Sequence, residues 1–439
     1  MEALLVKGPA IIKGEVSIGG SKNSAMAIIP AALLAETPVV LENVPRISDV
    51  KIQLEIAEFL GARVQWLEAN TVKIDPTGLK PLSPPYELCT KIRASYYLMG
   101  VLLARFGRGK VPVPGGCDLG PRPIDQHIKG FTTLGADIVM NHGLVEMQGK
   151  SMKGSQIYLD VISVGATINI MLAAVRISGR TVIQNCAKEP EIVDLASFLN
   201  AMGARVRGAG TEVIKIDGVK SLHGTNYRVI SDRIEAGTFM LAAAATRGQV
   251  LIKNVVSQHL NPVIAKLKES GVRVFAGEDT IFVDATHDLR SVDVDTCPYP
   301  GFPTDLQSFV AVLLTQSKGT GIITENVFVD RFRYLEELKR LGASIKVFKK
   351  SAMISGVSPL SACTVQATDI RAGAACIIAG LVAMGITEIK GVHHIDRGYD
   401  RIEDKLRLLG ADLVRVNDTS RKCLQWQGTS MLHSFSDRC

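Results

Sequence analysis

Cys117 is the residue whose surroundings most suggest acid–base or covalent chemistry. It lies in the segment 112–127, which holds four prolines and three glycines and therefore predicts a loop. The positive charge of Arg122 would favour the Cys117 thiolate, whereas Asp118 would favour the protonated thiol, the form that can act as an acid. From composition alone, a reactive thiol and an incidental exposed loop cysteine both stay open.

A second group of residues places positive charge at expected helix starts. Polar segments precede apolar runs at six places, and the basic residues in them are Lys22, Lys91, Arg93, Arg233 and Arg371. Backbone N–H groups at a helix N-terminus carry partial positive charge, so added cations predict a site for a strongly anionic ligand. The alternative is ordinary solvated charge. We favour the anion site because the helix dipole disfavours cations at these positions, yet they recur there.

A sequence repeat accounts for the regular spacing of these helix starts. A Leu-Gly-Ala-like tripeptide recurs at separations of 68 to 74 residues, with its glycine at Gly61, Gly135, Gly203, Gly271, Gly342 and Gly410. Solenoid repeats are shorter, at roughly 20 to 50 residues. Each copy is therefore expected to be a small αβ module.

Each copy shows the same order of expected elements. An Ala/Leu/Met-rich run, such as 25–34 or 237–245, follows the polar start and lacks the polar face of a surface helix. A β-branched strand comes next, as at 39–43, and then an amphipathic helix that ends at the repeated glycine, where left-handed backbone is needed. Buried helices flanked by strands predict an α/β fold with helices inside, sheets outside, and six units split into two halves.

Composition favours an enzyme for small anions over a membrane or nucleic-acid-binding protein. The 439 residues are 46% hydrophobic, and the net charge of +7 is spread along the chain. Segment 1–8 lacks a signal peptide's apolar stretch, and the apolar run 372–386, 15 residues with three glycines, is shorter than a membrane span of roughly 18. Eight cysteines without a CxxC pair predict a reduced, cytoplasmic protein with no metal site.

Five short motifs follow one another along nearly the whole chain. They are Ser21-Lys22-Asn23, Pro114-Gly115-Gly116-Cys117, Arg122-Pro123-Ile124-Asp125, Gly301-Phe302-Pro303-Thr304-Asp305 and His394-Ile395-Asp396-Arg397-Gly398-Tyr399. In type, order and separation this set closely resembles the UDP-N-acetylglucosamine 1-carboxyvinyltransferases. The resemblance implies two inside-out α/β domains of three units each. One would hold residues 22–230 with the Cys117 loop, the other residues 1–21 and 231–439, and the active site would lie in the cleft between them.

The resemblance also implies a reaction. The enolpyruvyl group of phosphoenolpyruvate passes to the 3-hydroxyl of UDP-N-acetylglucosamine and phosphate is released, the first committed step of peptidoglycan precursor synthesis. No metal, cofactor, nucleic acid or membrane partner is implied. By match to the family, Cys117 would be the proton donor and Asp305 the carboxylate near the attacking hydroxyl, while the cations that bind phosphoenolpyruvate would be Lys22, Arg122 and Arg397.

A sugar-nucleotide site is implied as well. The substrate-binding residues come from both expected domains: Lys22, Asn23, Arg93, Arg122, Pro123, Ile124, Asp125, Gln126, Ser163, Val164, Gly165, Asp305, Val327 and Arg371. The sugar nucleotide would lie across all of these except Lys22 and Arg371. Simpler interpretations exist for four residues. Asn23 and Asp305 are also suited to be helix N-caps, Arg397 to be part of a solvated charged face, and Val327 to be a packing residue.

Two departures from the family pattern leave the acceptor open. After Val327 and Phe328 the family usually has Glu-Asn-Arg-Phe, whereas this chain has Val329 and Asp330 before the Arg-Phe pair, and Asp118 stands where a small uncharged residue is common. One alternative is therefore a related enolpyruvyltransferase for another uridine nucleotide or a shikimate-type acceptor. A further alternative is a non-catalytic anion-binding protein, against which stands the joint presence of all the catalytic residues.

Overall fold

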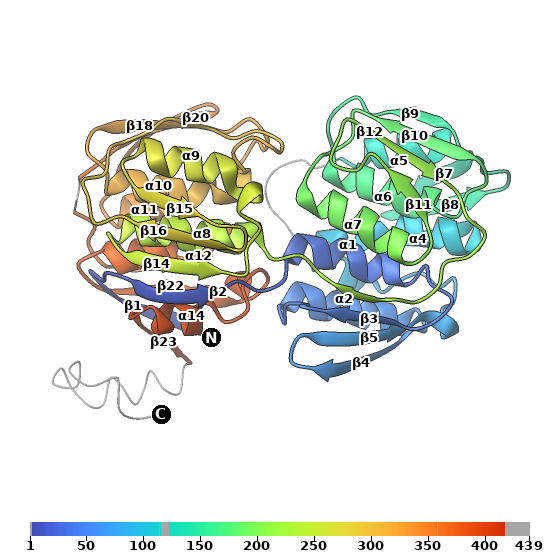
Figure 1. The fold of residues 1–439 in the computed structure, drawn as a ribbon, viewed down its shortest axis with the longest axis horizontal. Helices are drawn as coiled ribbons and strands as arrows, with labels where there is room; N and C mark the ends of the chain where they lie inside the picture. The colour runs from blue at the N-terminus through green and yellow to red at the C-terminus, as the bar shows by residue number, and fades with distance from the viewer. Residues whose placement is uncertain (1, 114, 116–122, 358, 418–439) are drawn as a thin grey trace.

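The chain forms two lobes that lie side by side (Figure 1). The computed structural model describes residues 2–113, 115, 123–357 and 359–417. Each lobe has its own hydrophobic core. The core of the first lobe draws on residues 25 to 229, and that of the second lobe on residues 4 to 18 and 234 to 413. The domain limits at 22–230 and at 1–21 plus 231–439 stay a prediction, which this division of the cores supports.

Three buried helices fill the first lobe: α1 (Lys22–Ala32), α4 (Tyr97–Phe106) and α6 (Val164–Ala174). Three outer helices accompany them, α2 (Ser48–Phe59), α5 (Asp125–Thr133) and α7 (Pro190–Ala201), with the short α3 (Tyr86–Cys89), η1 (Pro76–Gly78) and η2 (Arg93–Tyr96). The first sheet has the order β13 (Asn226–Arg228), β3 (Val39–Glu42), β5 (Thr71–Asp75), β4 (Arg63–Glu68). The second is β6 (Arg108–Pro112), β8 (Leu144–Gly149), β7 (Ala136–Asn141), and the third β11 (Arg205–Arg207), β12 (Val213–Asp217), β10 (Arg180–Gln184), β9 (Gln156–Tyr158).

The second lobe repeats this plan. Its inner helices are α8 (Arg233–Ala245), α10 (Gln307–Thr315) and α12 (Ile370–Val382), and its outer ones α9 (Asn261–Glu269), α11 (Leu335–Arg340) and α14 (Ile402–Leu408), with α13 (Val392–Ile395), η3 (Ser257–Leu260) and η4 (Thr304–Leu306). One sheet has the order β15 (Arg273–Ala276), β16 (Thr280–Asp284), β14 (Gln249–Lys253), β2 (Lys13–Ser17). The others are β17 (Val294–Asp295), β18 (Thr320–Thr324), β20 (Ser351–Ser355), β19 (Ser344–Phe348), and β21 (Thr364–Gln366), β22 (Gly385–Lys390), β1 (Ala3–Gly8), β23 (Asp412–Val416).

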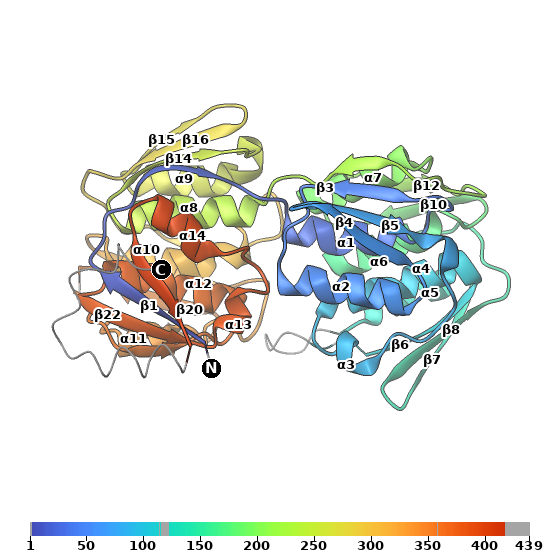
Figure 2. The same ribbon diagram turned by 90° about the horizontal axis from the view of Figure 1, so that it is seen from below.

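The predicted α/β architecture is confirmed. The inner helices are buried along nearly their whole length, and the sheets lie around them (Figures 1 and 2). All six repeated glycines follow an outer helix and have left-handed φ angles between 88° and 104°. Glycine is favoured there because a side chain is strained in that conformation.

Two chain segments cross between the lobes next to each other. Gly20 forms an antiparallel bridge with Ser231, and the Ser21 N–H donates to the Ile230 carbonyl at 2.7 Å. The crossing of the chain between the lobes is therefore a short paired ribbon, and no flexible linker is found there.

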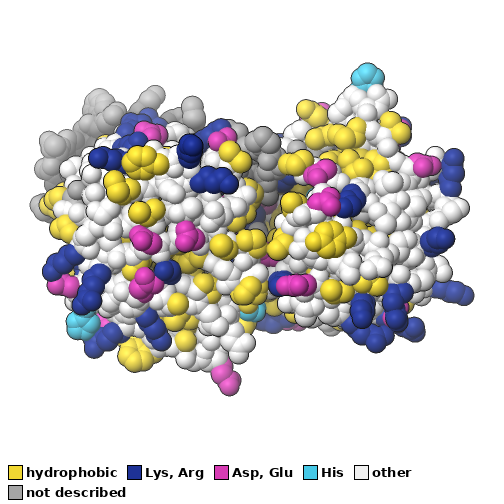
Figure 3. Space-filling model, turned by 90° about the horizontal axis from the view of Figure 1, so that it is seen from above, with side chains coloured by type: hydrophobic (Ala, Val, Ile, Leu, Met, Phe, Trp, Pro, Cys, Tyr) yellow, Lys and Arg dark blue, Asp and Glu magenta, His cyan; other side chains and the backbone are white. Residues whose placement is uncertain are grey.

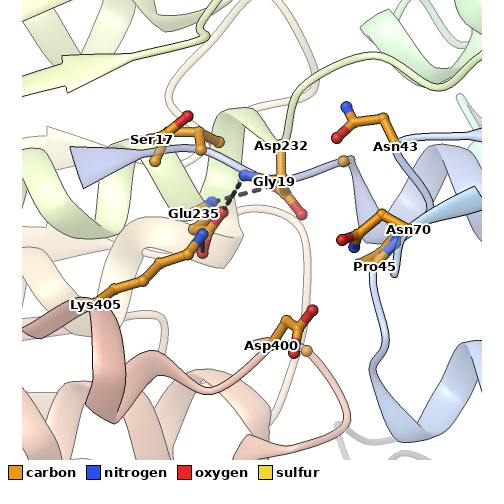
Figure 4. A pocket seen from close by; sticks show the side chains of 12 residues that line it. Ser17, Gly19, Asn43, Pro45, Asn70, Asp232, Glu235, Asp400 and Lys405 are labelled. Carbon is orange, nitrogen blue, oxygen red and sulfur yellow. Dashed lines mark hydrogen bonds and ion pairs between the residues drawn. The ribbon is translucent and has the colours of Figure 1, made fainter. Parts of the chain in front are cut away.

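A cavity of about 230 Å³ lies beside this crossing. Figure 4 shows the buried carboxylate of Glu235 in it, which accepts from the Lys405 ammonium at 2.6 Å and from the Gly19 N–H at 2.9 Å. This pairing attaches the first crossing segment to α8 and α14 of the second lobe.

The surface and the helices bear on possible partners. On the face drawn in Figure 3, Lys and Arg side chains lie in several separate groups among acidic and apolar ones. No helix in the described part of the chain is long and apolar enough to cross a membrane.

Two adjacent glycines at the crossing give a matched stability test. A Cβ on Gly20 would overlap the carbonyl oxygen of Asn43, whereas a Cβ on Gly19 would lie 3.6 Å from its nearest neighbour, an oxygen of Glu235. Gly20→Ala should lower the free energy of unfolding by about 1–3 kcal/mol, the usual cost of overpacking. Urea unfolding should show Gly19→Ala close to wild type, and equal loss in both variants would contradict this account of the crossing.

Candidate active site

The predicted cations Lys22 and Arg397 come from different lobes and meet on one carboxylate. Lys22 begins α1, whose N-cap is Ser21, and Arg397 follows α13. The Lys22 Nζ lies 2.7 Å from Oδ2 of Asp49, and the Arg397 Nε lies 2.8 Å from Oδ1 of Asp49. Asp49 is only 4% exposed. The interpretation of Arg397 as part of a solvated face is therefore wrong, because its guanidinium joins the lobes through a buried ion pair.

Two guanidinium groups and the Asp49 carboxylate act on the Lys22 ammonium group. Burial lowers the pKa of its ammonium group, Asp49 opposes that shift, and the nearby guanidinium groups of Arg371 and Arg397 lower the pKa further. Cations gathered from two lobes around Asp49 form a place where an incoming anion is stabilised.

Asp305 forms a second carboxylate centre, in the second lobe. Its Oδ1 accepts from Arg331 at 2.9 Å and its Oδ2 from Arg371 at 3.1 Å. Burial opposes ionisation of Asp305, but the guanidinium groups of Arg371 and Arg331 outweigh it and hold the pKa of this carboxyl well below its usual range. Asp305 is consequently a fixed negative charge and a hydrogen-bond acceptor at neutral pH.

The interpretation of Asn23 and Asp305 as helix caps is wrong. Asn23 lies within α1, and its side-chain amide donates to Glu191 Oε1 at 3.3 Å. Asp305 lies within η4, whose N-cap is Pro303. Both side chains are therefore available for contacts other than capping.

The residues predicted on the nucleotide side gather at the start of α6. Ser163 caps this helix by accepting from the Ala166 N–H at 3.2 Å, so Val164 and Gly165 form the first turn. Nearby in the first lobe, the guanidinium of Arg93 lies 5.4 Å from the ring centre of Tyr96. The first turn of α6 thus offers backbone N–H groups to an anion, with a basic side chain among the neighbouring elements.

The segment before and within α5 is held by Gln126. Its side-chain oxygen accepts from the Asp160 N–H at 2.9 Å, and its amide donates to the Asp125 carboxylate at 2.8 Å. Ile124 is buried, whereas Pro123 is exposed. Gln126 therefore ties the start of α5 to the segment after β9.

Val327 is not a packing residue. It is 39% exposed, and its backbone N–H donates to Glu325 Oε1 at 2.8 Å.

Two other predicted residues, Cys117 and Arg122, lie outside the described residues. Within the described ranges, no cluster of three or more His, Cys, Asp or Glu side chains is placed to hold a metal ion.

Sequence reasoning missed several residues that bind the predicted ones. Besides Asp49 and Arg331 these include Asp232, whose Oδ1 caps α8 by accepting from the Ile234 N–H at 2.7 Å, while its Oδ2 accepts from the Lys22 N–H at 3.0 Å. One carboxylate thereby binds the starts of an inner helix from each lobe. The only local signals were the helix starts at Ser48-Asp49 and Asp232-Arg233.

Comparison with known proteins places the chain in a family. A model of the family described as EPSP synthase (3-phosphoshikimate 1-carboxyvinyltransferase) matches residues 6–406. The UDP-N-acetylglucosamine 1-carboxyvinyltransferase 3 of Caldanaerobacter subterraneus subsp. tengcongensis is 52% identical over 95% of this chain and 100% of that protein. The UDP-N-acetylglucosamine 1-carboxyvinyltransferase of Halothermothrix orenii is 52% identical over the same shares.

Solved structures agree in fold. The enolpyruvyl transferase NikO of Streptomyces tendae has a TM-score of 0.86 at 27% identity, covering 94% of this chain and 99% of that one. An EPSP synthase of Acinetobacter baumannii has a TM-score of 0.74 at 21% identity over 95% and 100%, which supports the fold alone. The chain belongs to the UDP-N-acetylglucosamine 1-carboxyvinyltransferases, within the wider carboxyvinyltransferase family.

Asp49→Asn tests the carboxylate shared by the two lobes. The substitution leaves Lys22 and Arg397 without their buried counter-ion, so the free energy of unfolding at pH 7 should fall by about 3–5 kcal/mol. Loss of Asp49 also lowers the pKa of Lys22 further below its unfolded value. The resulting destabilisation is fully present below the folded-state pKa of Lys22 and is relieved as the pH rises toward 10.5, the ordinary pKa of a lysine. The difference in the free energy of unfolding between wild type and variant should therefore be smaller at pH 10 than at pH 7.

Urea unfolding of wild type and variant at both pH values measures this. The matched control is Asp288→Asn, which removes an exposed carboxylate paired with Lys318 at 2.6 Å and should leave the unfolding midpoint nearly unchanged. Equal stability of Asp49→Asn and wild type would show that the shared carboxylate is not a stabilising link.

Proposed function

We propose that this member of the UDP-N-acetylglucosamine 1-carboxyvinyltransferase family transfers the enolpyruvyl group of phosphoenolpyruvate to the 3-hydroxyl of UDP-N-acetylglucosamine and releases phosphate. The observation that carries the proposal is the pair of charge centres, with Lys22 and Arg397 on Asp49, and Asp305 held ionised by two arginines. Relatives about half identical over nearly the full length carry the corresponding name. The reaction would begin the synthesis of peptidoglycan precursors.

Phosphoenolpyruvate would bind between the lobes. Its phosphate and carboxylate need cations around them, and guanidinium groups fit both in bidentate geometry. Lys22 and Arg397 already stand together on Asp49, so the incoming anion would become their counter-ion. Arg122 is the third cation in this proposal, by its match to the family.

Cys117 and Asp305 would have different roles in the proposed reaction, the first as proton donor and the second as hydrogen-bond acceptor. The Cys117 thiol gives a proton to C3 of phosphoenolpyruvate while the sugar oxygen bonds to C2 and its proton passes to water. The adduct then loses phosphate, and a C3 proton returns to the Cys117 thiolate, which restores the double bond and the thiol. Because the arginines keep the pKa of Asp305 low, this carboxylate suits a hydrogen-bond acceptor that aims the 3-hydroxyl at C2 better than a strong base.

The sugar nucleotide would lie across both lobes. Its diphosphate suits the first turn of α6 at Ser163, Val164 and Gly165, beside Arg93 and the segment 123–126. The sugar would reach toward Asn23, Asp305, Val327 and Arg371. These small molecules, and not nucleic acid, are the partners we propose, and we expect the enzyme to act in the cytoplasm.

Two of the departures from the family pattern, Val329 and Asp330, make no contact with the acceptor carboxylate of Asp305 among the described residues, and Asp118 lies outside those residues. Val329 is 77% exposed, and Asp330 pairs with Arg333 at 3.5 Å. The retained Arg331, in contrast, binds Asp305 directly. This arrangement favours UDP-N-acetylglucosamine over another uridine nucleotide or a shikimate-type acceptor.

Phosphate release from phosphoenolpyruvate tests the acceptor. We expect release with UDP-N-acetylglucosamine and little with UDP-glucose, UMP or shikimate 3-phosphate, because only the first offers both the diphosphate and the amino-sugar hydroxyl. Equal turnover with UMP would overturn the acceptor while sparing the reaction class.

Variants of Cys117 serve as controls in the same assay. Cys117→Ser should lose about 10²- to 10⁴-fold in rate, the usual contribution of a general acid, and Cys117→Asp should retain part of the rate because a carboxylic acid also donates a proton. The epoxide fosfomycin should inactivate only the cysteine form. Wild-type turnover by Cys117→Ser would remove this residue from the mechanism.

A further inference from the structure

Asn169 is a fully buried polar residue in the middle of the apolar helix α6, and it has three hydrogen-bond partners on three other elements. Its Oδ1 accepts from the Gly100 N–H in α4 at 2.8 Å, and its Nδ2 donates to the Tyr96 carbonyl in η2 at 2.8 Å. The third partner is Nδ1 of His127 in α5, 3.0 Å from Nδ2 of Asn169. Asn169 therefore ties α6 to its neighbours and contacts one imidazole.

The two backbone partners determine the tautomer of that imidazole. The Gly100 N–H is only a donor and the Tyr96 carbonyl only an acceptor, so the Asn169 amide has one orientation that satisfies both. In that orientation Nδ2 faces His127, and Nδ1 of His127 must accept. The proton of the neutral ring consequently lies on Nε2.

The surroundings of His127 keep the ring neutral. It is 3% exposed, and burial together with the guanidinium of Arg93 lowers the pKa of His127 to about 3, against a smaller opposing effect of Asp125. The other groups against the ring are uncharged: Tyr96, whose ring packs edge-on at 4.7 Å, and Asn169 and Gly165 of α6. His127 is thus an uncharged hydrogen-bond donor across the neutral pH range.

This donor lies beside the first turn of α6. A Cβ added to Gly165 would lie 3.1 Å from Cε1 of His127 and 2.5 Å from the hydroxyl oxygen of Tyr96. Among the described residues, neither Nε2 of His127 nor the Tyr96 hydroxyl has a hydrogen-bond partner. Two polar groups on side chains that are more than nine-tenths buried are thus left at a helix N-terminus, where an anion is favoured.

We propose that Asn169 is a positioning residue that holds His127 as a neutral Nε2–H donor, and that His127 and the Tyr96 hydroxyl give two uncharged hydrogen bonds to the diphosphate of a uridine nucleotide at the start of α6. The identity of the ligand rests on the proposed function. The tautomer does not, because it follows from contacts within the chain.

Nitrogen NMR of the full-length protein tests the tautomer without any ligand. The His127 signals should show a protonated Nε2 and an unprotonated Nδ1, with no titration between pH 6 and pH 8.5. A protonated Nδ1 in the wild-type protein would overturn the proposal.

Asn169→Asp reverses the hydrogen bond to His127 and keeps the contact with Gly100, because a carboxylate oxygen still accepts there, but it loses the donor to the Tyr96 carbonyl. The carboxylate requires a proton on Nδ1 of His127 and raises the pKa of the ring. Above that pKa, Nε2 carries no proton and presents a lone pair to the diphosphate. Calorimetry with UDP-N-acetylglucosamine should show nearly constant affinity for wild type from pH 6 to pH 8.5, and for the variant a loss of about tenfold or more over the same range. A loss in the variant that is independent of pH would mean a structural role only.

Two isosteric variants of His127 locate the donor. The amide nitrogen of glutamine reaches the position of Nε2, whereas that of asparagine reaches only the position of Nδ1. His127→Gln should bind UDP-N-acetylglucosamine within a few-fold of wild type, and His127→Asn about 10- to 100-fold more weakly, the effect of losing a hydrogen bond to a charged group. Equal affinities would overturn the proposed contact. If the variants bind in this order but the wild-type protein releases no phosphate, the proposed reaction is refuted and the positioning role of Asn169 stands. If the wild-type protein does not bind UDP-N-acetylglucosamine, the proposed ligand is wrong.

Discussion

The burial of charge between the lobes is the constraint on which the site depends. Asp49 accepts from Lys22 of the first lobe and from Arg397 of the second, and all three groups are largely removed from water. A buried charge without a partner is destabilising by several kcal/mol, roughly 3–5, so Arg397 of the second lobe depends on Asp49 of the first for its counter-ion. In the proposed reaction phosphoenolpyruvate adds negative charge to a cluster whose cations come from both lobes.

The inside-out fold brings these groups together. Because sheets surround the inner helices, the N-termini of these helices are free to point to one region, and each needs an acceptor. Ser21, Ser163, Asp232 and Asp369 supply such acceptors at the starts of α1, α6, α8 and α12. The Asp232 carboxylate serves α8 and also the first N–H of α1, so a contact at the crossing of the chain directly positions Lys22.

Local sequence patterns predicted the six αβ modules but not the contacts between residues that are far apart in the sequence. The repeated glycines were predictable because left-handed backbone is a property of one residue, and the buried helices because their composition lacks a polar face. The partnership of Asp49 with Arg397 spans 348 residues of sequence, and no local pattern contains it. The role of Asn169 was not predicted for a related reason, since one amide in an apolar run does not indicate which imidazole it contacts. The cap interpretation of Asn23 and Asp305 failed because Ser21 and Pro303 occupy the cap positions.

The central claim is that Arg397 binds phosphoenolpyruvate and not the sugar nucleotide. Parallel measurements on Arg397→Ala test this claim most directly. Steady-state kinetics should show a large rise in KM for phosphoenolpyruvate, while calorimetry shows UDP-N-acetylglucosamine bound within a few-fold of wild type. Arg273→Ala, which removes a half-exposed arginine paired with Asp284 at 2.6 Å in the same lobe, should change neither value. Equal weakening of both ligands by Arg397→Ala would contradict the account.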